Sequence, residues 1–158
     1  GYPELYAKEL SENQSMIQEI KNAIISGMPY LAECGGFMYL HEFMEDMKGN
    51  AHPMLGIIKG TVYKTSKLGR FGYIELKSNK KSVFGNENLF CRGHEFHYFD
   101  STSNGADFVA KKPLTNRSWE CIHANENGVA GFPHMYYYSN PQMIVEFLKN
   151  CERTDEGE

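Results

Sequence analysis

Apolar residues recur with helical spacing in the first third of the chain. A helix is predicted from about residue 14, with Ser11 or Asn13 placed to cap its start and Gly27 to close its end. Its apolar face is formed by Met16, Ile17, Ile20, Ala23 and Ile24. A shorter helix is expected over residues 4–10. The segment 30–32 is apolar, brief and flanked by chain breakers, which predicts a buried strand.

The alternation of elements continues through Gly35-Gly36, after which a helix is predicted from Phe37 to about Met47. Helix, strand, tight turn and helix in this order are typical of an α/β sheet. A strand at 129–132 and a helix beginning at Asn140-Pro141 close the pattern, because asparagine caps well and proline suits the first helical turn.

Residues 52–122 change character and are rich in short β segments separated by Gly, Asn or Ser. The strands expected there are 54–58, 61–64, 71–76, 89–91, 95–99, 108–110 and 118–122. We therefore predict a three-layer α/β fold with a mixed, mostly parallel sheet and a β-rich middle section. One domain is expected over residues 1–151, followed by a polar tail at 152–158.

The composition is that of a folded domain. The chain has 158 residues, of which 41% are hydrophobic and 23% are charged, which excludes a disordered segment. No run approaches the roughly 20 apolar residues of a membrane span, and no signal peptide is visible. The net charge of −4 lacks the basic balance of nucleic-acid binders. We expect a cytoplasmic protein that binds neither nucleic acid nor membrane.

The four cysteines show no metal-binding spacing. No two of them form a C-x-x-C pair, so neither a structural zinc site nor a thioredoxin-type motif is expected. A chain of this length builds a core without disulfides. Cys91, Cys121 and Cys151 are expected to be small hydrophobic residues in strands or a helix.

Cys34 differs because it lies between a predicted strand and a predicted helix, in Ala32-Glu33-Cys34-Gly35-Gly36. Small residues two positions before and after it are typical of a nucleophile elbow. The positive helix end is expected to lower the pKa of the thiol. The Gly35 N–H is placed to donate to an oxyanion at an attacked carbonyl. The alternative is a buried cysteine at an ordinary strand–helix turn.

A cysteine nucleophile needs a histidine that accepts its proton and later protonates the leaving group. His134 directly follows a predicted strand, where ligands collect in open α/β sheets. His97 shares one face of an alternating strand with Glu95, and the chemistry alone does not separate it from His134. The histidines expected at solvated surface positions are His41, His52 and His123.

A metal site built from His94, Glu95 and His97 is a further alternative. Strand alternation turns His94 away from the other two side chains, which disfavours such a site. We therefore expect no metal in this chain.

Several ordered blocks resemble a known family. They are Gly1-Tyr2-Pro3-Glu4-Leu5, Ser11-Glu12-Asn13, Ala32-Glu33-Cys34-Gly35-Gly36, Arg70-Phe71-Gly72-Tyr73, Arg92-Gly93-His94-Glu95-Phe96-His97-Tyr98 and Ser139-Asn140-Pro141. Over residues 1–150 the chain resembles the C-terminal glutamine amidotransferase domain of cobyrinic acid a,c-diamide synthase.

The resemblance implies a class I (triad-type), flavodoxin-like glutamine amidotransferase fold. It implies that the elbow cysteine attacks the side-chain amide of glutamine, releases ammonia and forms a thioester that water hydrolyses. A preceding synthetase domain would use ATP and magnesium to activate the a- and c-carboxylates of the corrin ring for amidation. Glutamine and that synthetase domain are thus the expected partners, and no cofactor is expected in this chain itself.

Residue by residue, the resemblance assigns the nucleophile to Cys34 and an oxyanion-binding amide to Gly35. His134 matches the catalytic histidine, counted back from Ser139-Asn140-Pro141, which separates it from His97. Glu95 and His97 belong to a shared motif and are expected to position the glutamine or orient His134. The alternative places both on the solvent face of a half-buried strand.

Two features depart from the family. Tyr136 stands where triad glutaminases at large carry a glutamate, so a Cys–His dyad is expected, and Pro133 fixes the backbone before the base. The chain begins at the second glycine of a Gly-Gly-Tyr-Pro-Glu turn, so a domain truncated at its N-terminus is expected. Gly1 would then supply the second oxyanion donor poorly, and the isolated chain should hydrolyse glutamine slowly. A catalytically inactive binding or scaffold module is the alternative function.

Overall fold

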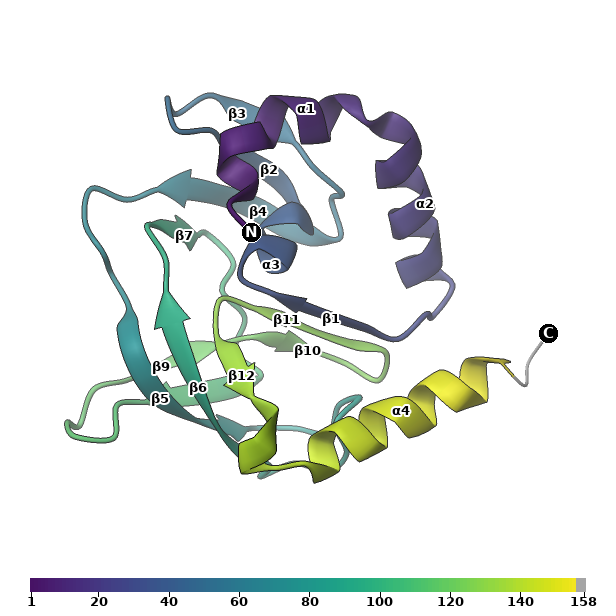
Figure 1. The fold of residues 1–158 in the computed structure, drawn as a ribbon, viewed down its shortest axis with the longest axis vertical. Helices are drawn as coiled ribbons and strands as arrows, with labels where there is room; N and C mark the ends of the chain where they lie inside the picture. The colour runs from purple at the N-terminus through teal and green to yellow at the C-terminus, as the bar shows by residue number, and fades with distance from the viewer. Residues whose placement is uncertain (156–158) are drawn as a thin grey trace.

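The computed structural model describes the backbone of residues 1–155 and the side chains to residue 152. Its centre is a three-stranded sheet in which β1 (Tyr30–Glu33) pairs in parallel with β11 (Gly128–Gly131), and β10 (His123–Ala124) pairs antiparallel with β11. Helix α2 (Gln14–Ile25) and helix α4 (Gln142–Asp155) lie on opposite sides of these strands (Figure 1). The centre of the molecule therefore has three layers.

Alternation along β1 and β11 explains why both faces of the sheet are covered. Ala32 and Ala130 belong to the same core cluster as Ile17 of α2, whereas Val129 belongs to the second cluster, with Met143 of α4. Successive strand residues point to opposite faces, so one short strand pair contributes to two cores. At roughly 25 cal/mol per Å² of apolar surface, these two cores are the main stabilising contribution to the fold.

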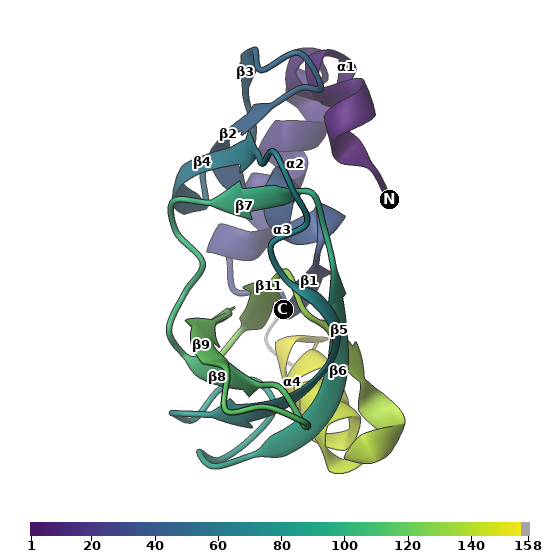
Figure 2. The ribbon, with the colours of Figure 1, turned by 90° about the vertical axis from the view of Figure 1, so that its left-hand side faces the viewer.

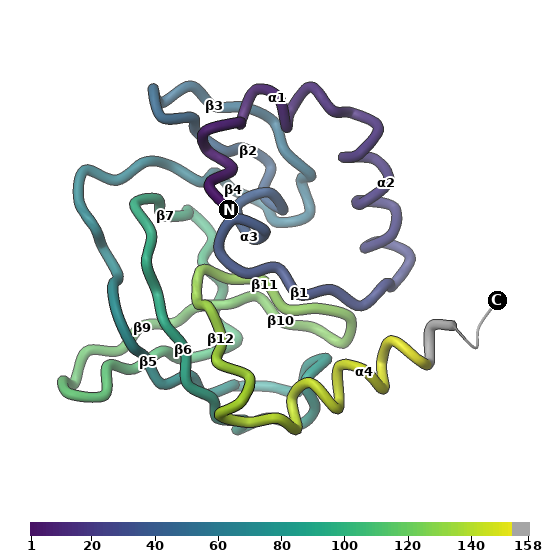
Figure 3. Tube along the Cα trace, viewed as in Figure 1, coloured from purple at the N-terminus to yellow at the C-terminus, as the bar shows by residue number. Residues whose placement is uncertain are grey.

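The helices before β1 form where the spacing of apolar residues predicts them. A 3-10 turn (η1, Pro3–Tyr6) runs into α1 (Ala7–Glu12), and Asn13 caps α2 by accepting a hydrogen bond from the Met16 N–H. The elbow helix is α3 (Gly35–Tyr39). The tube in Figure 3 places the start of the chain beside α3.

Two further sheets flank the centre, one toward each end of the molecule (Figure 2). The four-stranded sheet has the order β3 (Ala51–Pro53), β2 (His41–Glu45), β4 (Ile58–Lys64) and β7 (Phe99–Ser101). The five-stranded sheet has the order β12 (His134–Tyr136), β6 (Phe90–Phe96), β5 (Phe71–Ser78), β8 (Phe108–Lys111) and β9 (Ser118–Cys121). A short 3-10 turn, η2 (Tyr137–Ser139), joins β12 to α4.

The α/β class, the mixed sheet and the β-rich middle section are confirmed, but a mostly parallel sheet is wrong. Among the described strands only β1 with β11 and β2 with β4 pair in parallel. The middle section consists of strands joined by short connections, and such connections favour antiparallel neighbours. β6 also runs across 90–96, where two separate strands were predicted.

The predicted helix from Phe37 to about Met47 is also wrong beyond Tyr39. The helix ends at Tyr39, and the chain continues as β2, which lies between β3 and β4. Met44 of this strand pairs with Val62, and both side chains are fully buried. These long-range contacts override a local spacing that fits a helix equally well.

His41, expected at the surface, is fully buried in β2. Its Nδ1 lies 2.9 Å from the Phe37 carbonyl, to which it donates, and its Nε2 accepts from the Ser101 hydroxyl at 2.7 Å. Both ring nitrogens are thus satisfied in the neutral form. Burial lowers the pKa of His41, and the bond to Phe37 partly opposes this. His52 and His123 are half-buried rather than solvated.

This buried histidine predicts acid lability. Below the usual histidine pKa near 6.5, the unfolded chain takes up a proton that folded His41 refuses, so stability falls with decreasing pH until the lowered pKa is reached. The loss should approach about 1.4 kcal/mol per pH unit. Urea unfolding at pH 7.5, 6.5 and 5.5 measures it. His41→Gln should flatten the slope, and equal slopes for both proteins would contradict the assignment.

The polar segment expected as a tail at 152–158 begins inside α4, which continues to Asp155. Residues 156–158 lie outside the described part of the chain. None of the described helices combines the length and apolar character needed to cross a membrane.

Candidate active site

Cys34 occupies a sharp turn between β1 and α3. Its backbone has φ 49° and ψ −103°, a conformation that costs free energy for any residue with a side chain. Its N–H donates to the Gly131 carbonyl at 2.8 Å, and its carbonyl accepts from the Met38 N–H at 2.9 Å. The sheet and the helix therefore hold the cysteine in a strained conformation from both sides.

Small neighbours make this turn possible. A Cβ atom at Gly36 would lie 3.5 Å from the Ala32 side chain, and one at Gly35 would lie 3.0 Å from Pro3 Cδ and 3.9 Å from Gly1 Cα. The first residues of the chain thus pack directly on the residue after the cysteine. The structure brings Gly1 and Gly35, both predicted to bind an oxyanion, to the same place.

A cavity of about 930 Å³ opens above the turn. The predicted site residues that line it are Cys34, His134, Gly35, Gly1 and His97. His134 enters from β12, about a hundred positions along the chain from Cys34. Its other polar lining residues include Glu33, Glu4, Tyr39 and His94. The cavity is large enough for an amino acid of the size of glutamine.

The pKa of the Cys34 thiol is raised, not lowered as the sequence led us to expect. Burial is the main cause, the Gly35 N–H opposes it, and the carboxylates of Glu4 and Glu33 raise the pKa further. The helix that begins here has only five residues, so its dipole is weak. A thiol in this environment needs a base before it can act as a nucleophile.

The other cysteines differ in environment. Cys91 and Cys121 are fully buried, as expected, and burial raises the pKa of each thiol to about 12. Cys151 is half-buried in α4. The prediction of small hydrophobic cysteines is confirmed for the two strand residues.

His134 faces a carboxylate that sequence reasoning missed. Its Nδ1 lies 3.7 Å from Glu33 Oε2. Glu33 Oε1 accepts hydrogen bonds from the Met135 N–H at 3.1 Å and from the Tyr137 hydroxyl at 2.6 Å. The sequence did contain a signal for these contacts. Glu33 is a charged residue at the end of a buried strand, beside Cys34, and such a residue needs polar partners.

Glu95 and His97 are both buried, so the alternative of a solvent-facing pair is wrong. His97 Nδ1 donates to the Phe99 carbonyl at 2.6 Å, its ring stacks on Phe132, and its Nε2 lies 3.8 Å from Glu95 Oε2. His97 lines the cavity, whereas Glu95 does not. Glu95 therefore lies behind His97, outside the lining of the cavity.

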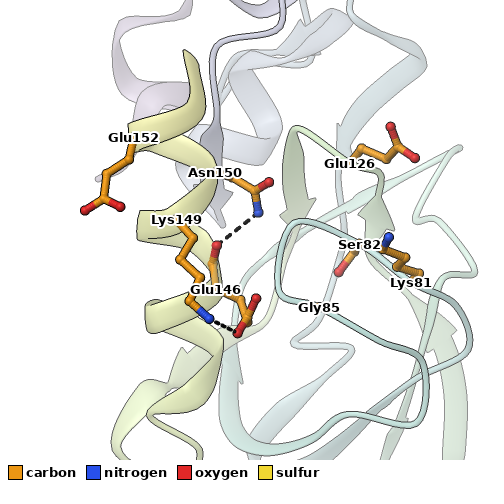
Figure 4. Close-up of a pocket in the computed structure, with 8 residues that line it drawn as sticks. All are labelled: Lys81, Ser82, Gly85, Glu126, Glu146, Lys149, Asn150 and Glu152. Carbon is orange, nitrogen blue, oxygen red and sulfur yellow. Dashed lines mark hydrogen bonds and ion pairs between the residues drawn. The ribbon is translucent and has the colours of Figure 1, made fainter. Parts of the chain in front are cut away.

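A second pocket of about 590 Å³ lies between α4 and the turn at 81–85 (Figure 4). The charged residues that line it are Lys81, Lys149, Glu126, Glu146 and Glu152, and Lys149 donates a hydrogen bond to Glu146 at 2.8 Å. Its lining contains neither cysteine nor histidine, so it lacks the cysteine–histidine pair of the predicted chemistry. Within the described part of the chain, no three His, Cys, Asp or Glu side chains cluster in a way that would hold a metal ion.

The sequence matches known proteins along most of its length. Residues 1–141 match the model of the CobB/CobQ-like glutamine amidotransferase domain. The chain is 40% identical over 153 residues to a cobyrinate a,c-diamide synthase of Caldanaerobacter subterraneus, covering 96% of this chain and 34% of that protein. Proteins of the same name from Fusobacterium nucleatum and Leptospira interrogans are 40% and 34% identical, covering 92% and 97% of this chain and 32% and 35% of each relative.

The chain spans about a third of the length of these relatives. The family model covers the elbow, the cavity and the strand that bears His134. On this evidence the chain belongs to the family of CobB/CobQ-like glutamine amidotransferase domains.

Proposed function

We propose that this chain is the glutamine-hydrolysing part of an ATP-dependent ligase that amidates the a- and c-carboxylates of cobyrinic acid. Cys34 is the nucleophile and His134 the base. The observation that carries the proposal is the strained turn that holds Cys34 at the floor of a cavity which His134 also lines. The substrate of the ligase follows from the names of the relatives.

The reaction proceeds through a thioester. His134 takes the thiol proton while the sulfur of Cys34 bonds to the amide carbon of glutamine. The C–N bond breaks, and the imidazolium returns the proton to the nitrogen, which leaves as ammonia. Water, deprotonated by His134, then attacks the thioester, and the C–S bond breaks. Glutamine and water thus give glutamate and ammonia, with the thiol restored.

The charge that develops on the carbonyl oxygen needs hydrogen-bond donors. We assign this role to the backbone of Gly35 and of Gly1, which pack together beside the sulfur. His97 reaches the cavity and is the proposed contact to the glutamine, with Glu95 behind it.

ATP and magnesium belong to the ligase step. The cavity does not fit them. The described residues provide no cluster of carboxylates that would hold magnesium, and the negative charges of Glu4 and Glu33 in the lining oppose the phosphates of ATP. We derive no step through either group in this chain. We assign both to a synthetase segment. About two thirds of the length of each relative lies outside the match, which leaves room for such a segment.

A covalent probe tests the cysteine chemistry. Treating the chain with the chloromethyl ketone analogue of glutamine should give one adduct, on Cys34, because Cys91 and Cys121 are buried with thiol pKa values of about 12. Intact mass and peptide mapping locate the adduct, excess glutamine should slow its formation, and Cys34→Ala should prevent it. Equal labelling of all four cysteines would favour an inactive binding module instead.

A further inference from the structure

A carboxylate faces His134 from a strand other than its own. Tyr136, two residues after the histidine, offers only an exposed phenol ring that packs against Tyr138. Glu33, the last residue of β1, instead places Oε2 3.7 Å from His134 Nδ1. The side chain of Glu33 is 26% exposed and lines the same cavity.

Two hydrogen bonds fix the Glu33 carboxylate. Oε1 accepts from the Met135 N–H and from the Tyr137 hydroxyl at 2.6 Å. Burial raises the pKa of that hydroxyl, and its bond to Glu33 raises it further, so Tyr137 stays protonated and donates at neutral pH. Because Oε1 is occupied, Oε2 is left for the imidazole.

We infer that Glu33 is the positioning residue that orients His134, in place of the carboxylate that Tyr136 lacks. The inference rests on the proposed function. With Oε2 accepting from Nδ1–H, the proton of neutral His134 stays on Nδ1 and Nε2 is free to receive the proton of Cys34. The separation of 3.7 Å is longer than a hydrogen bond. Catalytic contacts are often this loose before substrate binds and tighten in the substrate complex.

The direct effect of Glu33 on Cys34 has the opposite sign. Its negative charge raises the pKa of the thiol, as does that of Glu4. A Glu33 that acted only by this charge would hinder ionisation of Cys34, whereas a Glu33 that acts through His134 assists it. Removal of the charge therefore separates the two roles.

Glu33→Gln is the decisive variant. Its amide oxygen keeps the bonds to Met135 and Tyr137, while its NH₂ group faces Nδ1 and favours the wrong tautomer. Alkylation of Cys34 by iodoacetamide at pH 7.5 should slow by about tenfold or more, as a rise of one unit in the thiol pKa would cause. Glu4→Gln, the matched control in the same cavity, should accelerate alkylation. Acceleration by both variants would overturn the inference.

A double-mutant cycle tests the route of the effect. In a His134→Ala background, Glu33→Gln should no longer slow alkylation, because the group through which it acts is gone. Slowing by the same factor in both backgrounds would show that Glu33 only supports the fold. If His134→Ala alone leaves alkylation unchanged, the proposed Cys–His chemistry itself is overturned. If His134→Ala slows alkylation and Glu33→Gln does not, only the role of Glu33 is overturned.

A measurement on the unaltered chain tests the inference even where a variant does not fold. The ¹⁵N chemical shifts of the His134 ring at pH 8 report which nitrogen carries the proton. Protonation at Nδ1 is the expected result. Protonation at Nε2 would overturn the inference without any substitution.

Discussion

Replacing Cys34 with alanine should reduce ammonia release from glutamine by a factor on the order of 10⁴ to 10⁶, the range seen when a covalent nucleophile is removed. The loss is this large because no other described thiol lines the cavity, so the thioester route has no substitute. Alanine has the same Cβ atom as cysteine and therefore the same backbone strain at φ 49°, so the stability of the fold should change little. Ammonia is measured by a coupled assay on this chain and on a longer form that carries it.

Cys151→Ala is the matched control. This cysteine is half-buried in α4, away from the cavity, and its replacement should leave ammonia release within about twofold of the unaltered protein. Residual activity above a tenth in Cys34→Ala would show that another group attacks glutamine. Loss of activity in Cys151→Ala would point to damage of the fold rather than of the chemistry.

Local patterns predicted the elements whose information is local. The stripe of α2, its cap at Asn13 and the buried strand before Cys34 depend on neighbours a few residues apart, and they form as expected. The burial of His41 depends on its contact with Ser101, sixty positions away, and on the pairing of β2 with β4. The spacing of apolar residues carries no information about a partner so far along the chain. Neither the burial of His41 nor the strand that contains it was therefore predicted.

The same difference between local and long-range information decides which residues of the site were predicted. The elbow was predictable because small residues around Cys34 are adjacent in the chain, and the resemblance to the family supplied His134. Glu33 was missed because its contacts, Met135 and Tyr137, lie more than a hundred positions away, and because the orienting carboxylate was sought next to the histidine. The direction of the Cys34 pKa shift was wrong because burial outweighs the N–H donors.

The close contact between two strands of the five-stranded sheet leads to a second large effect. Gly93 of β6 lies opposite Met135 of β12, and a Cβ atom there would be 2.8 Å from the His134 carbonyl oxygen and 3.2 Å from Leu76. The oxygen belongs to the backbone, so it cannot move aside as a flexible side chain would. Gly93→Ala should therefore push β12 away from β6 and displace His134 from the cavity.

A displacement of about 1 Å in a catalytic group costs roughly 10² in rate, and an overpacked site costs about 1–3 kcal/mol of stability. We expect both losses in Gly93→Ala, measured by ammonia release and by urea unfolding. Gly69→Ala is the control, because nothing lies within 4 Å of a Cβ at that glycine. Neither glycine has the positive φ that would strain an alanine, so the comparison tests the space available to the added Cβ. Full activity in Gly93→Ala would mean that His134 need not stand where β12 now holds it.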